Sequence, residues 1–296
     1  MLRVDRVTKR FKLGAFGSAE KVAVSDVSFE VGRGEVLSII GESGSGKSTI
    51  GRMVLRLLVP SGGSITFDGE DVATLRRGDL KRYYQRVQGV FQDPFSSYNP
   101  VYKVDRVLGM MRASYLPELS AADWKVKLRK SLEAVSLEPA AVLGKYPHQL
   151  SGGQLQRLMI ARALLLDLKF LVADEIISML DASTRIDVLN LLGDLKERGV
   201  GILFITHDLS LGNYISDTTL ILRRGRIVEM GATEQVYGNP AHPYTQMLLT
   251  SVPHLTERWS PGAHAPVMAD GGGEADGDAP LMRLTDDHFA AIRGDT

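Results

Sequence analysis

The amino-acid sequence predicts an α/β fold with a helical insertion. A mostly apolar strand, Glu35–Gly41, is followed by a glycine-rich loop and then by apolar residues at helical spacing. Two later apolar strands, Phe170–Asp174 and Gly201–Thr206, are separated by another helical segment. Because strands that alternate with helices are typical of a parallel sheet with crossover helices, we expect an α/β core. Residues 95–165 predict helices inserted into that core.

The first 31 residues alternate apolar and polar side chains, which predicts short β-strands. A glycine-containing loop, Lys12–Lys21, separates them. After the later glycine-rich loop, apolar residues recur every three to four positions and predict a helix: Ile50, Val54, Leu57 and Leu58.

The inserted segment carries two further helical patterns. Ser120 and Asp123 form a capping-box pattern that predicts where the second of these helices begins. The expected buried faces of the two helices consist of Val107, Leu108, Met111 and Tyr115, and of Trp124, Leu128, Leu132 and Val135. A crossover helix between the later strands is predicted by Val188, Leu191, Leu192 and Leu195.

The C-terminal part differs in composition. Asp270–Asp278 contains four glycines and four acidic residues, which is typical of a flexible linker. The segment LMRLTDDHFAAI, residues 281–292, predicts a short docking helix.

Composition excludes several classes of protein. The 296 residues contain 35 Lys and Arg and 35 Asp and Glu, so the basic excess typical of a nucleic-acid scaffold is missing. There are no cysteines, which excludes disulfides and thiolate metal sites. The charged N-terminus lacks the apolar core of a secretory signal, and charges interrupt the longest apolar region, Leu158–Ala173. We expect a soluble, cytoplasmic chain.

The loop GESGSGKST matches the phosphate-binding pattern G-x-x-x-x-G-K-[ST]. Its glycines let backbone N–H groups turn toward phosphates, and the following helix points its positive end at them. Lys47 would reach the β- and γ-phosphates, and the Ser48 hydroxyl would bind Mg²⁺. The residues expected to bind the nucleotide are Gly41, Ser43, Gly44, Ser45, Gly46, Lys47, Ser48 and Thr49. The flanking strand and helix favour this site over a chance glycine turn.

Two adjacent carboxylates end the strand that begins at Phe170. Asp174 can hold Mg²⁺ opposite Ser48, and Glu175 can orient or deprotonate the attacking water. Without the glycine loop, a strand that simply ends in acidic residues would be the better interpretation.

The sequence LSGGQ begins a further helix. Ser151 followed by Gly152 and Gly153 at a helix start can form a second anion-binding site, with Gln154 beside it. Taken alone, these residues are more typical of an ordinary helix cap.

In combination, these motifs resemble the nucleotide-binding subunit of an ABC transporter, and the resemblance covers about residues 1–255. Three further residues match motifs of that family: Gln92 in a Q-loop, Asp181 in a D-loop and His207 as a switch histidine. The family implies a RecA-like core, an antiparallel β subdomain and a helical subdomain. The resulting division is a first part of the core at 1–94, the helical subdomain at 95–165, a second part of the core at 166–235, a C-terminal element at 236–255 and a flexible acidic tail at 256–296.

The resemblance also implies that two such subunits share ATP. ATP on the glycine loop of one subunit would be covered by the LSGGQ sequence of the other subunit. Ser151, Gly153 and Gln154 would then contact the γ-phosphate of the ATP on the opposing subunit. Glu175 would polarise water and His207 would steady both Glu175 and the γ-phosphate. The remaining implied roles are signalling across the dimer by Asp181, sensing of Mg²⁺ and γ-phosphate by Gln92, and adenine stacking by Phe11, with Phe16 as second choice.

The segments QDPFSSYNP and Asn239–Leu249 resemble the peptide and nickel importer branch, which is related to oligosaccharide importers. Because this chain has no cysteine, we expect no iron–sulfur cluster of the kind that many members of the branch carry. The proline that the family usually has after the glutamate at the position of Glu175 is Ile176 here. Its loss leaves φ freer and adds an N–H group, and we expect catalysis to survive.

The resemblance implies a peripheral ATPase on the cytoplasmic face of the cell membrane. Its expected direct partners are a second ATPase subunit, either a copy or a paralogue, and two permeases. One permease is expected to dock beside Phe95–Asn99. A substrate-binding protein is expected as an indirect partner. Two alternatives remain at this stage: a soluble ABC ATPase acting on DNA or ribosomes, and a regulator that binds nucleotide without turnover. The sequence names neither the cargo nor, by itself, the direction of transport.

Overall fold

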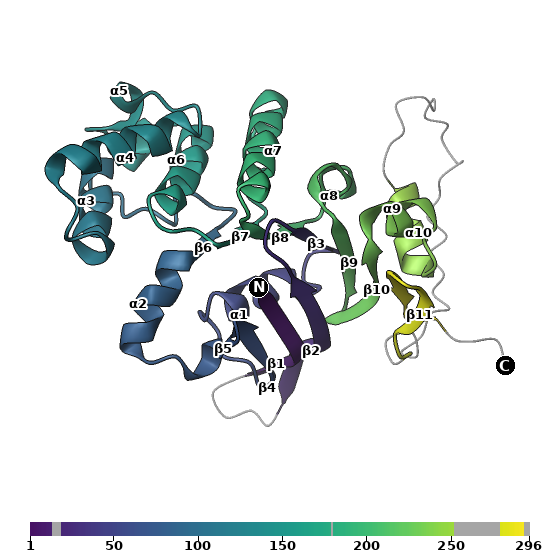
Figure 1. The fold of residues 1–296 in the computed structure, drawn as a ribbon. Coiled ribbons are helices and arrows are strands. Elements are labelled where there is room, and N and C mark those ends of the chain that lie inside the picture. Colours follow the sequence, from purple (N-terminus) through teal and green to yellow (C-terminus); the bar gives the residue numbers. More distant parts are fainter. Residues whose placement is uncertain (14–18, 179, 252–278, 293–296) are drawn as a thin grey trace.

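The computed structural model describes residues 1–13, 19–178, 180–251 and 279–292. Two β-sheets lie next to each other, and helices cover them and extend to one side (Figure 1). One sheet is antiparallel and the other is largely parallel. The predicted α/β fold with an antiparallel part and a helical part is therefore confirmed.

The antiparallel sheet has the order β2-β1-β4-β5. Its strands are β1 (Leu2–Lys12), β2 (Glu20–Val31), β4 (Gly62–Phe67) and β5 (Glu70–Asp71). The first two strands are 11 and 12 residues long, so the prediction of short strands was wrong. Their pairing places Phe11 opposite Lys21 near the end of the ribbon.

The larger sheet has the order β11-β12-β10-β9-β3-β8-β7-β6. Its strands are β3 (Val36–Ile40), β6 (Val87–Val90), β7 (Phe170–Asp174), β8 (Gly201–Thr206), β9 (Thr218–Arg223), β10 (Arg226–Ala232), β11 (Met282–Thr285) and β12 (His288–Ala290). The five strands β9, β3, β8, β7 and β6 pair in parallel. All ten residues of β3 and β7, the two strands on either side of β8, are buried, and all but Ser38 and Asp174 are apolar. The turn between β9 and β10 has positive φ at Arg224 and Gly225, as expected for a tight hairpin.

Ten α-helices and two 3-10 turns occur in the described residues. The helices are α1 (Lys47–Val54), α2 (Arg77–Arg86), α3 (Val104–Tyr115), α4 (Ala121–Glu133), α5 (Pro139–Val142), α6 (Gly152–Leu164), α7 (Ala182–Glu197), α8 (Leu209–Ile215), α9 (Thr233–Gly238) and α10 (Pro243–Thr250). The turns are Val72–Thr74 and Pro147–Gln149. Helices α3 to α6 form a group beside the sheets, here called the helical subdomain (Figure 1).

Most residues of the predicted apolar faces pack into the core, but Leu57 is exposed because α1 ends at Val54. One buried cluster joins the helical subdomain to α7 and to residues of β7 and β8. A second cluster joins α1 to the antiparallel sheet. Trp124, Leu132 and Val135 are buried as predicted, and Leu128 packs partly buried against the same cluster. The Ser120 hydroxyl accepts the N–H of Asp123, which confirms the predicted helix cap.

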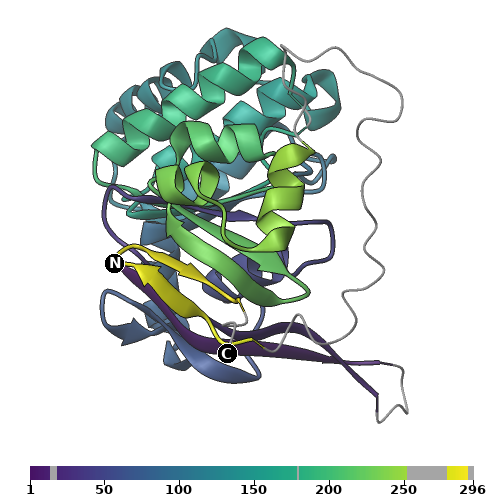
Figure 2. The same cartoon turned by 90° about the vertical axis from the view of Figure 1, so that its right-hand side faces the viewer.

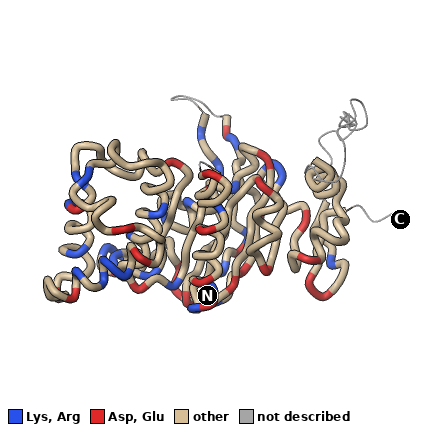
Figure 3. The backbone as a smooth tube through the Cα atoms, turned by 90° about the horizontal axis from the view of Figure 1, so that it is seen from above, with Lys and Arg blue, Asp and Glu red and all other residues tan. Residues whose placement is uncertain are grey.

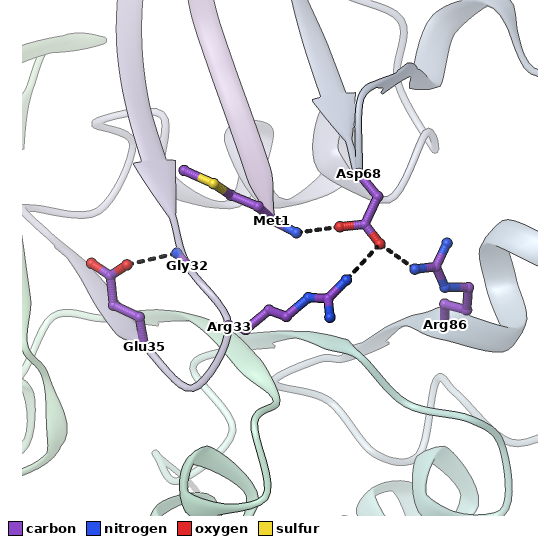
Figure 4. A network of polar contacts seen from close by, with 6 residues as sticks. All are labelled: Met1, Gly32, Arg33, Glu35, Asp68 and Arg86. Carbon is purple, nitrogen blue, oxygen red and sulfur yellow. Dashed lines mark hydrogen bonds and ion pairs between the residues drawn. The ribbon is translucent and has the colours of Figure 1, made fainter.

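Asp68 connects the two sheets at the surface (Figure 4). Its carboxylate, in the turn after β4, binds the amino group of Met1 and the guanidinium groups of Arg33 and Arg86. The Met1 amino group, whose hydrogen bond is the largest cause, and Arg86 lower the pKa of Asp68, while burial opposes this shift. Arg86 is the last residue of α2, so Asp68 fixes β1 and β4 against the start of β6.

The C-terminal segment contradicts two expectations. Residues expected to form a docking helix form a hairpin instead, with β12 paired antiparallel to β10 (Figure 2). The expected flexible tail at 256–296 is therefore wrong for Met282–Ala290, here called the C-terminal hairpin. Its inner strand buries His288 and Ala290, and the next residue donates its N–H to the Val228 carbonyl at 2.8 Å. The predicted linker Asp270–Asp278 lies outside the described residues.

Candidate functional site: a phosphate loop and its acidic neighbours

The glycine loop connects β3 to α1, as predicted. Gly46 has φ +109, and a Cβ there would lie 2.5 Å from the Ala23 carbonyl oxygen, so only glycine fits. At Gly41 a Cβ would lie 2.1 Å from the Leu222 carbonyl oxygen. Because α1 begins at Lys47, its free N–H groups and the positive end of its dipole face the loop. The loop is therefore built to receive an anion.

Lys47 spans the loop with its ammonium group. Its Nζ donates to the carbonyls of Gly41 at 2.6 Å and of Glu42 at 2.8 Å, and the residue is 4% exposed. Burial lowers the pKa of Lys47, while the nearby Glu175 and Asp174 carboxylates oppose this shift. A buried ammonium that is only partly neutralised favours a negatively charged ligand.

Ser48 and Asp174 meet behind the loop. The Ser48 hydroxyl donates to Oδ1 of Asp174 at 3.0 Å, across 126 residues of sequence. Burial raises the pKa of Asp174, and the bond from Ser48 opposes this. A hydroxyl and a carboxylate are hard oxygen ligands of the kind that Mg²⁺ prefers. Among the described residues, no group of three or more His, Cys, Asp or Glu side chains could hold a metal by itself. A cation here would therefore need ligand oxygens from a substrate, and Mg²⁺ commonly has such ligands.

Glu175 lies beside His207. Its Oε1 is 3.4 Å from His207 Nδ1, and the Glu175 side chain is 18% exposed. Glu175 has φ +51, a left-handed conformation that is uncommon for residues other than glycine, and its N–H donates to the Ile205 carbonyl at 2.9 Å. A proline restricts the residue before it to extended conformations, so Ile176 leaves this conformation open to Glu175. The Ile176 side chain is buried in the cluster below the helical subdomain.

These residues surround one cavity of about 800 Å³, which is within the size range of ligand pockets. The described residues that line it are Phe11, Lys21, Ala23, Ser43, Gly44, Gly46, Lys47, Ser48, Thr49, Gln92, Glu175 and His207. The structure thus brings most of the predicted nucleotide-binding and catalytic residues together. Asp174 lies next to them, bonded to the lining residue Ser48. Phe16 lies outside the described residues.

Sequence reasoning missed two lining residues of β2, Lys21 and Ala23. Lys21 faces the cavity because it pairs with Phe11 across the β1–β2 ribbon. The only signal in the sequence would have been the register of two strands joined by a glycine-containing loop.

The LSGGQ residues and Asp181 are not among the described residues that line this cavity. Ser151 caps α6, and the Gln154 side chain accepts the Ser151 N–H at 3.0 Å in a reciprocal capping box. Asp181 caps α7 and accepts bonds from Ser183 and Thr184. These bonds, that from Ser183 first, lower the pKa of Asp181. Both groups lie at the starts of helices, α6 and α7, and outside the described lining of the cavity.

The fold, the phosphate loop and the acidic strand end define an ATP-binding-cassette ATPase. Residues 24–178 match the family model for the ABC transporter, more than half of the chain, and residues 228–273 match the oligopeptide/dipeptide transporter C-terminal region. The chain belongs to the ABC transporter family.

Related proteins agree with this assignment. The chain is 46% identical over 238 residues to a protein of Brucella ovis named as a peptide import ATP-binding protein, covering 80% of this chain and 74% of that one. It is 40% identical to the dipeptide transport ATP-binding protein DppF of Lactococcus lactis, covering 98% and 93%. Among solved structures, the cassette MJ0796, a dimer bound to ADP and phosphate, matches with a TM-score of 0.71 at 28% identity, covering 79% of this chain and 99% of that one.

Proposed function

We propose that this chain is the ATP-hydrolysing subunit of an ABC importer that powers uptake of peptides through partner permeases. The observation that carries the proposal is the match of one chain to both the cassette and the peptide-transporter C-terminal region. The names of the relatives support peptides over the oligosaccharides that related importers carry. A subunit that hydrolyses ATP is favoured over a regulator that only binds nucleotide, because Glu175 and His207 lie next to each other at the cavity.

ATP would occupy the cavity with its phosphates on the glycine loop. Lys47 would exchange its bonds to the loop carbonyls for bonds to the β- and γ-phosphates. Ser48, Asp174 and Gln92 would hold Mg²⁺, which when bound neutralises developing charge on the phosphates. The Phe11 ring at the cavity rim would stack on adenine, and Lys21 beside it offers a cation to the phosphates.

Glu175 would orient the attacking water and accept its proton. Its place in the cavity lining supports this role, because a general base must lie within reach of the water whose proton it accepts. His207 Nδ1, 3.4 Å from its Oε1, would help to orient it. His207, with a 59% exposed side chain, would contact the γ-phosphate from the open side of the cavity.

A second ATPase subunit would complete the site. Ser151, Gly152, Gly153 and Gln154 would cover the partner's γ-phosphate, and Asp181 would report its state across the interface. These residues are not among the described residues that line this chain's own cavity, and MJ0796 is a dimer; both observations support an arrangement in which two subunits share the site.

Replacing Gly153 by alanine tests this arrangement. In this chain a Cβ at Gly153 would lie 3.5 Å from Leu180 Cδ2, an ordinary contact, so folding and single-chain nucleotide affinity should be retained. One methyl group in a tight interface disfavours packing by about 1–3 kcal/mol, so ATP-dependent dimerisation and turnover should fall by about 5- to 150-fold. Size-exclusion chromatography with ATP and phosphate release measure this. Gly193→Ala, where nothing lies within 4 Å, is the matched control, and equal behaviour of the two variants would contradict the proposal.

The proposed location is the cytoplasmic face of the cell membrane, where the chain would be bound to two permeases and indirectly to an extracytoplasmic substrate-binding protein. None of the described helices is long and apolar enough to cross a membrane. A permease helix would dock beside Phe95–Asn99, where Phe95 is 48% exposed. Acidic and basic residues are interspersed along the described chain (Figure 3), which favours a protein partner over nucleic acid.

The function is tested by coexpressing the chain with candidate permeases and measuring phosphate release from the reconstituted complex. We expect stimulation by a peptide-loaded binding protein and none by DNA or ribosomes. Stimulation by DNA without any permease would overturn the proposal.

A further inference from the structure

The C-terminal element contacts the phosphate loop directly. The N–H of Glu42, the second residue of the loop, donates to the Tyr244 hydroxyl oxygen at 3.2 Å, across 202 residues of sequence. Tyr244 is 3% exposed and packs in a small cluster with Ile40, the last residue of β3 before the loop. Burial raises the pKa of Tyr244, and the bond from the Glu42 N–H opposes this shift.

The start of α10 fixes Tyr244. Nδ1 of His242 accepts the Tyr244 N–H at 3.0 Å, and Pro243 occupies the first helical position, where a missing N–H is tolerated. The Arg223 guanidinium lies 4.9 Å from the centre of the Tyr244 ring. The ring therefore has little freedom to move away from the loop.

Glu229 connects this helix start to the C-terminal hairpin. Its Oε1 accepts the N–H of Ala241 at 2.8 Å and lies 2.7 Å from His288 Nε2, and its Oε2 accepts the N–H of His242 at 3.0 Å. Glu229 is 0% exposed and His288 3% exposed. A carboxylate this deeply buried is stable only when both oxygens are bonded, so each partner contributes to holding the others.

We propose that Tyr244 is a positioning residue for ATP and that the C-terminal hairpin sets its position through Glu229. The bond holds the outer side of the loop at Glu42, so that the following N–H groups point into the cavity before the nucleotide arrives. A loop ordered in advance loses less conformational entropy on binding. This inference rests on the proposed assignment of the cavity to ATP.

Tyr244→Phe tests the first step. The variant keeps the ring and removes one hydrogen bond, so ATP affinity of the full chain should fall by about two- to tenfold, while kcat at saturating ATP stays unchanged. Hydrogen exchange of the loop peptide containing Glu42 should be faster without nucleotide. Tyr84→Phe is the matched control, because its hydroxyl also makes a 3.2 Å bond, to the Leu55 carbonyl beyond the other end of α1. Affinity and exchange equal to those of the wild type and the control would overturn the proposal.

Two variants of His288 test the second step. His288→Ala removes the partner of Glu229 and should weaken ATP binding and speed loop exchange, as Tyr244→Phe does. Glutamine at this position can still donate to Glu229, so His288→Gln should restore both. Unchanged affinity and exchange in His288→Ala would overturn the role of the hairpin. Wild-type protein that binds no ATP would instead refute the proposed function, so the two failures are distinguishable.

Discussion

Glu175→Gln is expected to reduce ATP turnover by about 100- to 1,000-fold, the contribution usual for a general base, while nucleotide binding is retained. The amide has the size of the carboxylate, so the backbone N–H of residue 175 can keep its bond to the Ile205 carbonyl, and His207 need not move. It cannot accept the proton of the attacking water. The nucleotide should therefore remain as ATP, and a closed dimer should accumulate.

Single-turnover phosphate release and size-exclusion chromatography with ATP measure these two effects. Glu197→Gln, at the exposed last turn of α7, makes the same chemical change away from the cavity and should behave like the wild type. Turnover that survives in Glu175→Gln would refute the assignment of Glu175 as the base.

Asp174→Asn is expected to have two opposite effects. The asparagine carbonyl can still accept the Ser48 hydroxyl bond, but it brings no negative charge to Mg²⁺. Loss of a metal-site carboxylate should lower Mg²⁺-dependent turnover by about 10- to 100-fold. Without nucleotide, however, the variant should be more stable than the wild type at neutral pH, because the buried carboxylate is disfavoured in its charged form.

The pH dependence of that second effect follows from the raised pKa of Asp174. The folded protein binds the proton more tightly than the unfolded chain, so ionisation lowers stability. This loss is absent well below the ordinary carboxyl pKa of 3.8, grows as pH rises through it, and is complete above the raised pKa of the folded state. The difference in melting temperature between Asp174→Asn and wild type should therefore widen from acid to neutral pH. Asp194→Asn, on an exposed part of α7, is the control. A difference in melting temperature between Asp174→Asn and wild type that does not change with pH would contradict this prediction.

Much of the candidate site could be predicted because its chemistry is local in sequence. The glycine loop, Lys47 and Ser48 lie within nine consecutive residues, and the strand before them and the helix after them follow from short-range apolar patterns. The parallel sheet then brings Asp174 to Ser48, since the carboxyl ends of parallel strands meet at one edge. The roles of these residues, and those of Ser151 and Asp181, stay predictions until the variants are measured.

What the sequence could not predict depends on distant contacts. Residues 281–292 have a spacing compatible with a helix, but the open edge of β10 and the buried Glu229 favour a strand that begins at His288, whose ring bonds to Glu229. Strand formation depends on such neighbours more than helix formation does. The contact of Tyr244 with Glu42 is likewise invisible without the fold, because 202 residues separate them.

The C-terminal hairpin also determines which strand ends the large sheet. Without it, β10 would present a seven-residue row of backbone groups able to pair with a strand of another molecule. The hairpin covers that row, and close approach is possible because residue 231 is glycine, where a Cβ would lie 2.4 Å from the Asp287 carbonyl oxygen. The new outer strand, β11, is only four residues long and carries Arg283. Short, charged edge strands resist such pairing, so this segment protects the ATPase against aggregation as well as closing its fold.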